Sequence, residues 1–261
     1  MSSFNVRTAF LDDDEADRLY REYPHIGKSS ETYCPTCGKD GKFNWRGITY
    51  ICDCAQQLQL YKLYLSSGIG APYQRLGWKD YQGDPELVQV LRKYVEDHEQ
   101  YIASGEGLFF QGPVGTGKTM LATLVLKDLL KEGYSVYAKT FSQAIDMFTA
   151  GWYDDEERKY FHKKFVASQI LLLDDIGREH KTRLSESTFD SILRTRVQEG
   201  RPTLITTNMT IDEMESGYGA GILSLLKECS LHHIFTGPDF RPKVHERKQQ
   251  EKQAGERRPI Y

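Results

Sequence analysis

Over residues 77–241, short apolar runs alternate with longer helical stretches. The apolar runs predict buried strands at residues 108–111, 134–138, 169–174, 203–207 and 232–236. Most of the stretches between them are long enough for a crossover helix. This alternation is typical of an α/β domain in which helices cover both faces of a mostly parallel sheet.

The pattern divides the rest of the chain into four regions. Residues 1–30 form a polar N-terminal arm, which the sequence allows either as a helix after Leu11 or as a partly disordered segment. Residues 31–57 hold four of the 5 cysteines. Residues 58–76 predict a helical linker with a Gly- and Pro-containing break. Residues 242–261 are charged and poor in apolar residues, so we expect a disordered tail.

Composition and charge say more about where in the cell the protein acts than about its function. Asp and Glu number 37 against 34 Lys and Arg, so the formal charge of −3 does not indicate a nucleic-acid-binding protein. No apolar run is long enough to cross a membrane, and no N-terminal secretion signal stands out. We therefore expect a cytoplasmic protein with no membrane partner, whose reduced cysteines serve as metal ligands.

Residues 112–119 match the full pattern of a phosphate-binding loop. The eight residues are Gly112, Pro113, Val114, Gly115, Thr116, Gly117, Lys118 and Thr119. In such a loop, backbone N–H groups bind nucleotide phosphates, Lys118 reaches the β- and γ-phosphates, and the Thr119 hydroxyl binds Mg²⁺. An apolar run precedes the loop and a helical stretch follows it, so the phosphates would lie at a helix N-terminus.

Polar side chains at the ends of later strands complete the predicted ATP site. The apolar run that starts at Ile170 ends in Asp174 and Asp175. Asp174 is placed to hold Mg²⁺, directly or through water, and Asp175 to polarise the attacking water as a general base. Asn208 follows the next strand and is suited to bind the γ-phosphate or the lytic water. Arg241, near the end of the domain, is a fixed cation suited to a phosphate.

Four cysteines in two close pairs, Cys34 with Cys37 and Cys52 with Cys54, predict a zinc site. Alternating residues on either side of Gly47 predict a hairpin between the pairs. Because so short a segment has little core of its own, the metal would supply much of its folding free energy. A small core that holds the four cysteines without metal is the alternative.

With these motifs in this order, the chain resembles the DnaC/DnaI/IstB branch of AAA+ ATPases, which comprises bacterial and phage helicase loaders and transposition helpers. The resemblance covers residues 31–241 and rests on the segments GPVGTGKT, LLLDDIG, PTLITTN and GPDFR. It implies an AAA+ P-loop domain of three layers at residues 77–241, with ATP and Mg²⁺ as cofactors. A small zinc-binding module at residues 31–57 resembles the one with which DnaI-type loaders bind the helicase.

The resemblance also assigns roles and partners. Lys118 and Thr119 correspond to Walker A, Asp174 and Asp175 to Walker B, Asn208 to sensor I and Arg241 to sensor II. The implied function is ATP-dependent loading of a hexameric replicative DNA helicase onto single-stranded DNA during DNA replication, with further copies of the chain as an additional partner. An IstB-like transposition helper, or a zinc-bearing adaptor that uses ATP binding as a switch without efficient hydrolysis, are the alternatives. The cysteine module favours the loader.

Two departures from the family pattern concern the rate of hydrolysis. Asp175 stands where AAA+ proteins usually have Glu, so we expect slow hydrolysis rather than none. Leu225 stands where loaders carry an Arg that completes the ATP site of a neighbouring subunit. Lys227, Arg194 and Arg196 are the candidate replacements. We therefore expect hydrolysis that a partner stimulates.

Lys139 and Phe141 follow the second strand, on the face where ATPases of this branch hold single-stranded DNA. A base can stack on Phe141 while Lys139 meets a phosphate. Burial of Phe141 in the core explains the sequence equally well.

Overall fold

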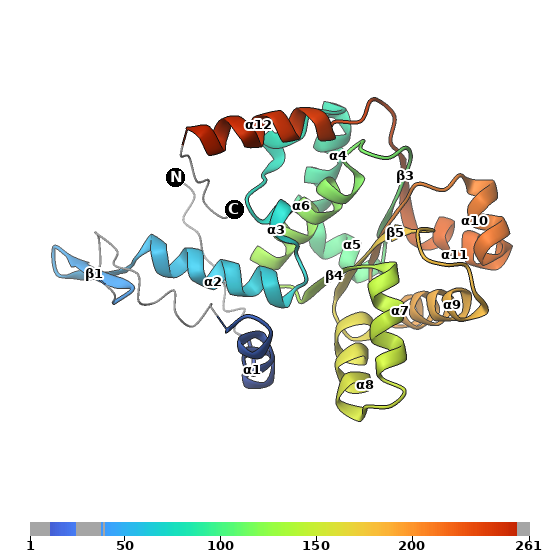
Figure 1. The fold of residues 1–261 in the computed structure, drawn as a ribbon, viewed down its shortest axis with the longest axis horizontal. Helices are drawn as coiled ribbons and strands as arrows, with labels where there is room; N and C mark the ends of the chain where they lie inside the picture. Colours follow the sequence, from blue (N-terminus) through green and yellow to red (C-terminus); the bar gives the residue numbers. More distant parts are fainter. Residues whose placement is uncertain (1–10, 25–37, 39, 255–261) are drawn as a thin grey trace.

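The structure, a computed structural model, describes residues 11–24, 38 and 40–254 (Figure 1). At its centre is a five-stranded parallel sheet with the strand order β4-β5-β6-β3-β7. The strands are β3 (Gly107–Gln111), β4 (Val136–Thr140), β5 (Ile170–Ile176), β6 (Thr203–Thr207) and β7 (Ser230–Ile234). Each predicted strand overlaps one of these, so the predicted α/β parallel sheet is confirmed.

Helices cover both faces of this sheet, which gives three layers (Figure 1). One face packs against α2 (Asp53–Ser66), α4 (Pro85–Glu96), α5 (His98–Ser104) and α6 (Lys118–Lys131). The other packs against α7 (Phe141–Ala150), α8 (Asp155–Phe161), a π-helical turn (His162–Val166), α9 (Arg183–Gln198), α10 (Ile211–Tyr218) and α11 (Ala220–Cys229). Side chains of β3 alternate between the two cores, since Leu108 and Phe110 join the first and Phe109 the second.

A buried cation, Arg196 of α9, holds together the loops that lead into β5 and β6. Its side chain is 0% exposed. The guanidinium donates hydrogen bonds to the Thr203 hydroxyl and to the carbonyls of Phe165, Val166, Ser168, Gln169 and Pro202. Arg196 is therefore a structural residue, which removes it from the candidates for the missing arginine finger.

Much of the predicted helical linker at residues 58–76 is helical and packs against the sheet. Leu60, Leu63 and Tyr64 of α2, together with Ile69, are buried in the core on the α6 face of the sheet. The chain then forms the short helix α3 (Ala71–Gln74) and a 3₁₀ turn, Trp78–Asp80.

A buried lysine of α6 ties this segment to the helix that follows the phosphate-binding loop. Lys127 Nζ donates hydrogen bonds of 3.0, 3.2 and 2.6 Å to three carbonyls, those of Tyr73, Gln74 and Leu76. One residue further along α6, Asp128 accepts a hydrogen bond of 2.7 Å from the Trp78 indole. Residues 73–78 are therefore fixed to α6 by backbone and side-chain contacts at once.

Part of the N-terminal arm is helical. The helix α1 (Asp13–Glu22) begins after Asp12, whose carboxylate accepts a hydrogen bond from the Glu15 N–H. Leu19 is buried, and Arg18 forms a bidentate pair with Glu157 of α8. Of the two alternatives for the arm, residues 13–22 thus follow the helical one.

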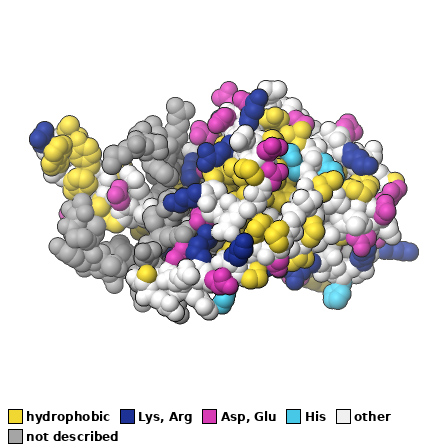
Figure 2. Space-filling view, turned by 90° about the horizontal axis from the view of Figure 1, so that it is seen from above, with side chains coloured by type: hydrophobic (Ala, Val, Ile, Leu, Met, Phe, Trp, Pro, Cys, Tyr) yellow, Lys and Arg dark blue, Asp and Glu magenta, His cyan; other side chains and the backbone are white. Residues whose placement is uncertain are grey.

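The predicted hairpin is confirmed and consists of β1 (Lys42–Trp45) and β2 (Ile48–Ile51), paired antiparallel. Its two turn residues, Arg46 and Gly47, have φ of 53° and 79°, as a two-residue hairpin turn requires. Trp45 and Ile48 face each other on one side of the hairpin and are 55% and 57% exposed. The hairpin projects from the far end of α2, where hydrophobic side chains gather at the left of the space-filling view (Figures 1 and 2).

The predicted zinc ligands fall only partly within the described residues. Cys34 and Cys37 lie outside them. Cys52 is buried at the first residue before α2, and Cys54 is exposed in the first turn of that helix. In the part of the chain that the structure describes, no three His, Cys, Asp or Glu side chains are grouped to hold a metal. The zinc site therefore stays a prediction.

The segment predicted as a disordered tail begins with a helix, α12 (Arg241–Gln253), so the prediction of disorder is wrong there. The charged composition of this segment gives no sign of the contacts that bind it to the rest of the protein. The Phe240 N–H donates to the Gly115 carbonyl at 3.0 Å, and Arg247 pairs with Asp80 at 3.1 Å. None of the helices within the described ranges combines the length and the apolar character that crossing a membrane needs.

Candidate functional site

The phosphate-binding loop joins β3 to α6 and lies between two side chains that leave room only for glycine. Gly115 and Gly117 have φ of 81° and 95°. A Cβ at Gly115 would lie 1.9 Å from Asp239 Oδ1, and one at Gly117 would lie 2.6 Å from the Tyr81 ring. Both glycines are therefore required by conformation and by space.

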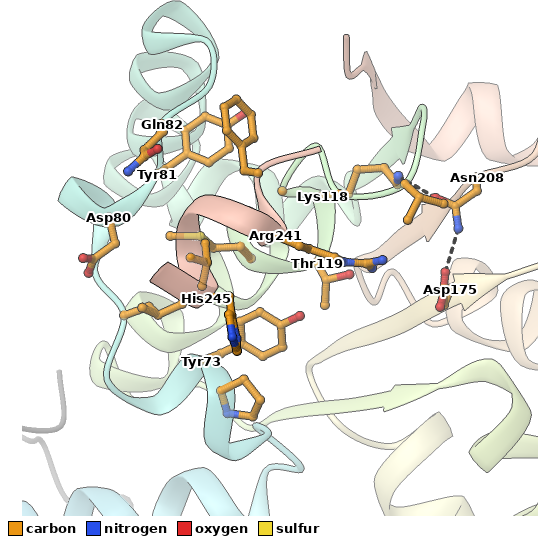
Figure 3. Close-up of a pocket in the computed structure, with 18 of the residues that line it drawn as sticks. Tyr73, Asp80, Tyr81, Gln82, Lys118, Thr119, Asp175, Asn208, Arg241 and His245 are labelled. Carbon is orange, nitrogen blue, oxygen red and sulfur yellow. Dashed lines mark hydrogen bonds between the residues drawn. The ribbon is translucent and has the colours of Figure 1, made fainter. Parts of the chain in front are cut away.

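Lys118, the first residue of α6, connects the loop to the end of β6. Its Nζ donates to Asn208 Oδ1 at 2.8 Å and to two carbonyls of the loop at 2.6 and 2.7 Å. Figure 3 shows the chain of hydrogen bonds that continues from Asn208 to Asp175. Burial lowers the pKa of Lys118, and the nearby carboxylate of Asp175 opposes that shift.

Asp174, near the end of β5, lies next to the first turn of α6. Its Oδ1 accepts hydrogen bonds from the hydroxyls of Thr119 at 2.8 Å and Thr206 at 2.6 Å. Burial raises the pKa of Asp174, and these two hydrogen bonds oppose that shift. Carboxylate and hydroxyl oxygens are ligands that Mg²⁺ prefers, so the pair Thr119 and Asp174 fits this ion.

Asp175, the residue after Asp174 in β5, has a strained backbone conformation. Its φ is 63°, in the left-handed region that residues with a side chain rarely adopt. Its N–H donates to Thr206 Oγ1, while its carboxylate accepts from Asn208 Nδ2 and from Arg178 Nη1, each at 2.9 Å. Such strain concentrates at functional sites, where surrounding contacts maintain it.

The strand order explains why these residues meet. Because β6 lies between β5 and β3, the carboxyl ends of all three strands form one edge of the sheet. Beside this edge lies a cavity of about 700 Å³, large enough for a nucleotide. The lining contains the predicted residues Val114, Gly115, Gly117, Lys118, Thr119, Asp175, Asn208 and Arg241.

The far wall of the cavity comes from residues that no sequence motif indicated. They are contributed by α3, by the loop after the 3₁₀ turn and by α12, and include Pro72, Tyr73, Tyr81, Gln82, Val244 and His245 (Figure 3). Burial raises the pKa of Tyr73, and a hydrogen bond with Thr119 acts in the opposite direction. Apolar rings and an amide suit the base and sugar of a nucleotide, whose phosphates would lie at the loop.

Arg241, the predicted sensor II residue, begins α12 and lines the cavity. Its N–H donates to Asp239 Oδ1 at 2.8 Å, and that carboxylate lies beside Gly115. The helix start is therefore positioned directly on the phosphate-binding loop.

The two residues predicted to contact DNA, Phe141 and Lys139, do not lie at the cavity. Phe141 is fully buried and packs its ring edge-on against Phe189 and Tyr218. The alternative of core packing is thus the correct one, and base stacking on Phe141 is not supported. Lys139 is half-buried in β4 and does not line the cavity.

The structure also places the remaining candidates for an arginine finger. Leu225 is partly buried against the second core, and Lys227 is exposed on the same helix, α11. Arg194, on α9, is exposed and pairs with Asp190 at 2.7 Å. Neither cation lines the cavity of its own chain, so only contact with a second molecule would give either of them access to a nucleotide.

Comparison with known proteins agrees with this geometry. A family model described as "IstB-like ATP binding protein" matches residues 79–234. The replicative helicase loader DnaC of Escherichia coli is 26% identical over 196 residues, which cover 72% of this chain and 78% of the loader. A putative ATP-binding protein in an insertion sequence of Mycobacterium tuberculosis is 24% identical over 170 residues, 63% of this chain and 66% of that protein.

Solved structures share the fold of the domain that contains the phosphate-binding loop. The crystal structure of the DnaC helicase loader superposes with a TM-score of 0.58 at 23% identity, over 64% of this chain and 100% of that one. The crystal structure of DnaI gives 0.53 at 23% identity, over 65% of this chain and 93% of that one. With its phosphate-binding loop and acidic strand end inside the matched region, the chain belongs to the family of IstB-like ATP-binding proteins, which is homologous to the DnaC and DnaI helicase loaders.

Proposed function

We propose that the protein is a cytoplasmic ATPase that loads a hexameric replicative DNA helicase onto single-stranded DNA during DNA replication. The observation that carries the ATPase is the cavity where Lys118, Asp175 and Asn208 meet. Similarity to a replicative helicase loader over 72% of the chain supports the loading role.

Each residue at the strand ends has a role in this proposal. Lys118 and Arg241 would bind the phosphates as cations, and Thr119 and Asp174 would hold Mg²⁺, which offsets phosphate charge. Asp175 would accept the proton of the attacking water. Asn208 would orient that water or the γ-phosphate, because its amide already joins Lys118 to Asp175.

The exposed hairpin would bind the helicase, with zinc at its base. Isolated two-stranded hairpins are marginally stable, and this one buries little of its aromatic face. A site of Cys34, Cys37, Cys52 and Cys54 would stabilise it, since Cys52 N–H donates to the Gly41 carbonyl and so lies beside the start of β1.

We expect the purified protein to contain one zinc ion per chain, measured by elemental analysis. Cys52→Ser should remove the zinc and weaken helicase binding, while ATP binding persists, because the cavity lies in the other part of the molecule. Cys229→Ser is the control, since Cys229 lies in α11. A full complement of zinc in Cys52→Ser would contradict the proposed ligand set.

The loading role can be tested with the helicase and a circular single strand that carries an annealed oligonucleotide. A ring helicase cannot thread onto a circle, so unwinding requires that its ring be opened. We expect this protein with ATP to allow unwinding, and helicase with DNA to raise its rate of ATP hydrolysis. Asp175→Asn should bind ATP but lose the stimulated hydrolysis. No effect on unwinding at any protein concentration would exclude the loader.

Two other functions have observations in their favour. The match to an ATP-binding protein in an insertion sequence supports a transposition helper, which would stimulate strand transfer by a transposase and leave the helicase unaffected. Leu225, in place of the expected arginine, supports an adaptor in which ATP binding alone is the switch. Such an adaptor would act with a nonhydrolysable ATP analogue as well as with ATP.

A further inference from the structure

Arg178, which none of the sequence motifs singles out, contacts the carboxylate proposed as the general base. Its Nη1 donates to Asp175 Oδ2 at 2.9 Å and forms an ion pair with it. Its N–H also donates to the Asp175 carbonyl at 3.4 Å, which closes a turn through Gly177. Arg178 is part of the lining of the nucleotide cavity.

As a result, both oxygens of Asp175 have partners. Asn208 Nδ2 donates to Oδ1 at 2.9 Å, and Arg178 holds Oδ2. A continuous chain of polar contacts thus runs from Lys118 through Asn208 and Asp175 to Arg178. The left-handed backbone of Asp175 is kept in place by the same contacts.

We propose that Arg178 is a positioning residue that restrains Asp175 and so keeps ATP hydrolysis slow. This inference rests on the proposed ATPase function. In the reaction, the water oxygen bonds to the γ-phosphorus while the bond from that phosphorus to the bridging oxygen breaks. ADP leaves with the electron pair, and Asp175 accepts the proton from the water. A guanidinium on Oδ2 competes with the water for the oxygen that must accept this proton.

The restraint is weak enough to be released. The Arg178 side chain is 70% exposed and that of Asp175 is 25% exposed, so water and salt reach the arginine side of the pair and reduce its free energy. Any anionic group that competes for the guanidinium would therefore free the carboxylate. This arrangement provides slow basal turnover that can be raised without moving the phosphate-binding loop.

The test compares Arg178→Ala and Arg178→Lys with the full-length protein at saturating ATP. We expect Arg178→Ala to raise kcat roughly two- to fivefold, the size of effect that an exposed ion pair allows, with KM for ATP unchanged. Arg178→Lys keeps the charge but lacks the planar guanidinium, so its kcat should lie between that of the unmodified protein and that of Arg178→Ala. Arg158→Ala is the matched control, because it removes a similarly exposed arginine that pairs with Asp155 three residues away, outside the cavity.

Salt gives a second measurement that a merely structural role would not affect. Raising the ionic strength from about 0.05 to about 0.5 M screens the pair, so the kcat of the unmodified protein should approach that of Arg178→Ala. An unchanged or lower kcat in Arg178→Ala, with ATP still bound, would overturn the inference and leave the ATPase proposal intact. ATP binding by both proteins without hydrolysis by either would also overturn it. If the unmodified protein fails to bind ATP, the proposed function itself is wrong.

Discussion

Lys118→Ala is expected to lower the affinity for ATP roughly 100-fold and to bring hydrolysis to background. The lysine is the cation at the centre of the phosphate-binding loop, and a charge-assisted hydrogen bond to phosphate contributes about 1.5–3 kcal/mol. Burial beside the loop strengthens such a bond, because little water competes for it. Titration with a fluorescent ATP analogue measures the affinity, and phosphate release measures the rate.

The matched control for this substitution is Lys131→Ala, at the other end of the same helix. Lys131 forms a half-buried ion pair with Asp128 and lies far along α6 from the loop. We expect its ATP affinity and its melting temperature to stay close to those of the unmodified protein. If Lys118→Ala, with an unchanged melting temperature, bound ATP as tightly as Lys131→Ala, the cavity could not be the phosphate site.

Arg196→Met should lower the free energy of unfolding by about 3–5 kcal/mol. The substitution removes the donors but leaves five carbonyls and a hydroxyl in a place that water does not reach. Each buried polar group left without a partner costs about 1–3 kcal/mol, and partial relaxation reduces the total. A domain of this kind has about 5–15 kcal/mol in all, so the loss is a large fraction. Urea denaturation followed by circular dichroism measures it.

Arg194→Met tests whether the effect belongs to burial rather than to loss of an arginine from α9. Arg194 is exposed and pairs with Asp190 one turn away, so its loss should change the free energy of unfolding by less than about 0.5 kcal/mol. Equal destabilisation by the two substitutions would show that the carbonyls around Arg196 find other partners.

Much of the fold could be predicted because the strands of a doubly covered parallel sheet are continuous apolar runs. Those runs stand out in sequence, and three of them, β3, β5 and β6, are followed by short polar motifs. The carboxyl ends of parallel strands share one edge of the sheet, and the order β5-β6-β3 then places Lys118, Asp174 and Asn208 next to one another. The motifs in the sequence therefore indicated which residues lie at the phosphate end of the cavity.

The other end of the cavity could not be predicted from local pattern. Tyr73 and His245 come from segments whose composition indicates a linker and a disordered tail, and only the packed structure places them on one wall. Arg196 shows the same limit, since a charged residue on a helix is normally solvated and its burial depends on carbonyls from distant loops. Phe141 is the opposite case, an aromatic residue that the sequence allows in an exposed role but that is buried. Its exposure could not be inferred from its neighbours in the chain.

The three carbonyls held by Lys127 make α6 and the segment before the 3₁₀ turn a single mechanical unit. One end of that unit is the helix start beside the phosphate-binding loop, and its other end continues into α2, whose 14 residues span about 21 Å. The hairpin lies directly before the first residue of α2. Because α2 and α6 pack in one core, packed elements rather than a loose tether connect the nucleotide cavity to the exposed aromatic face of the hairpin.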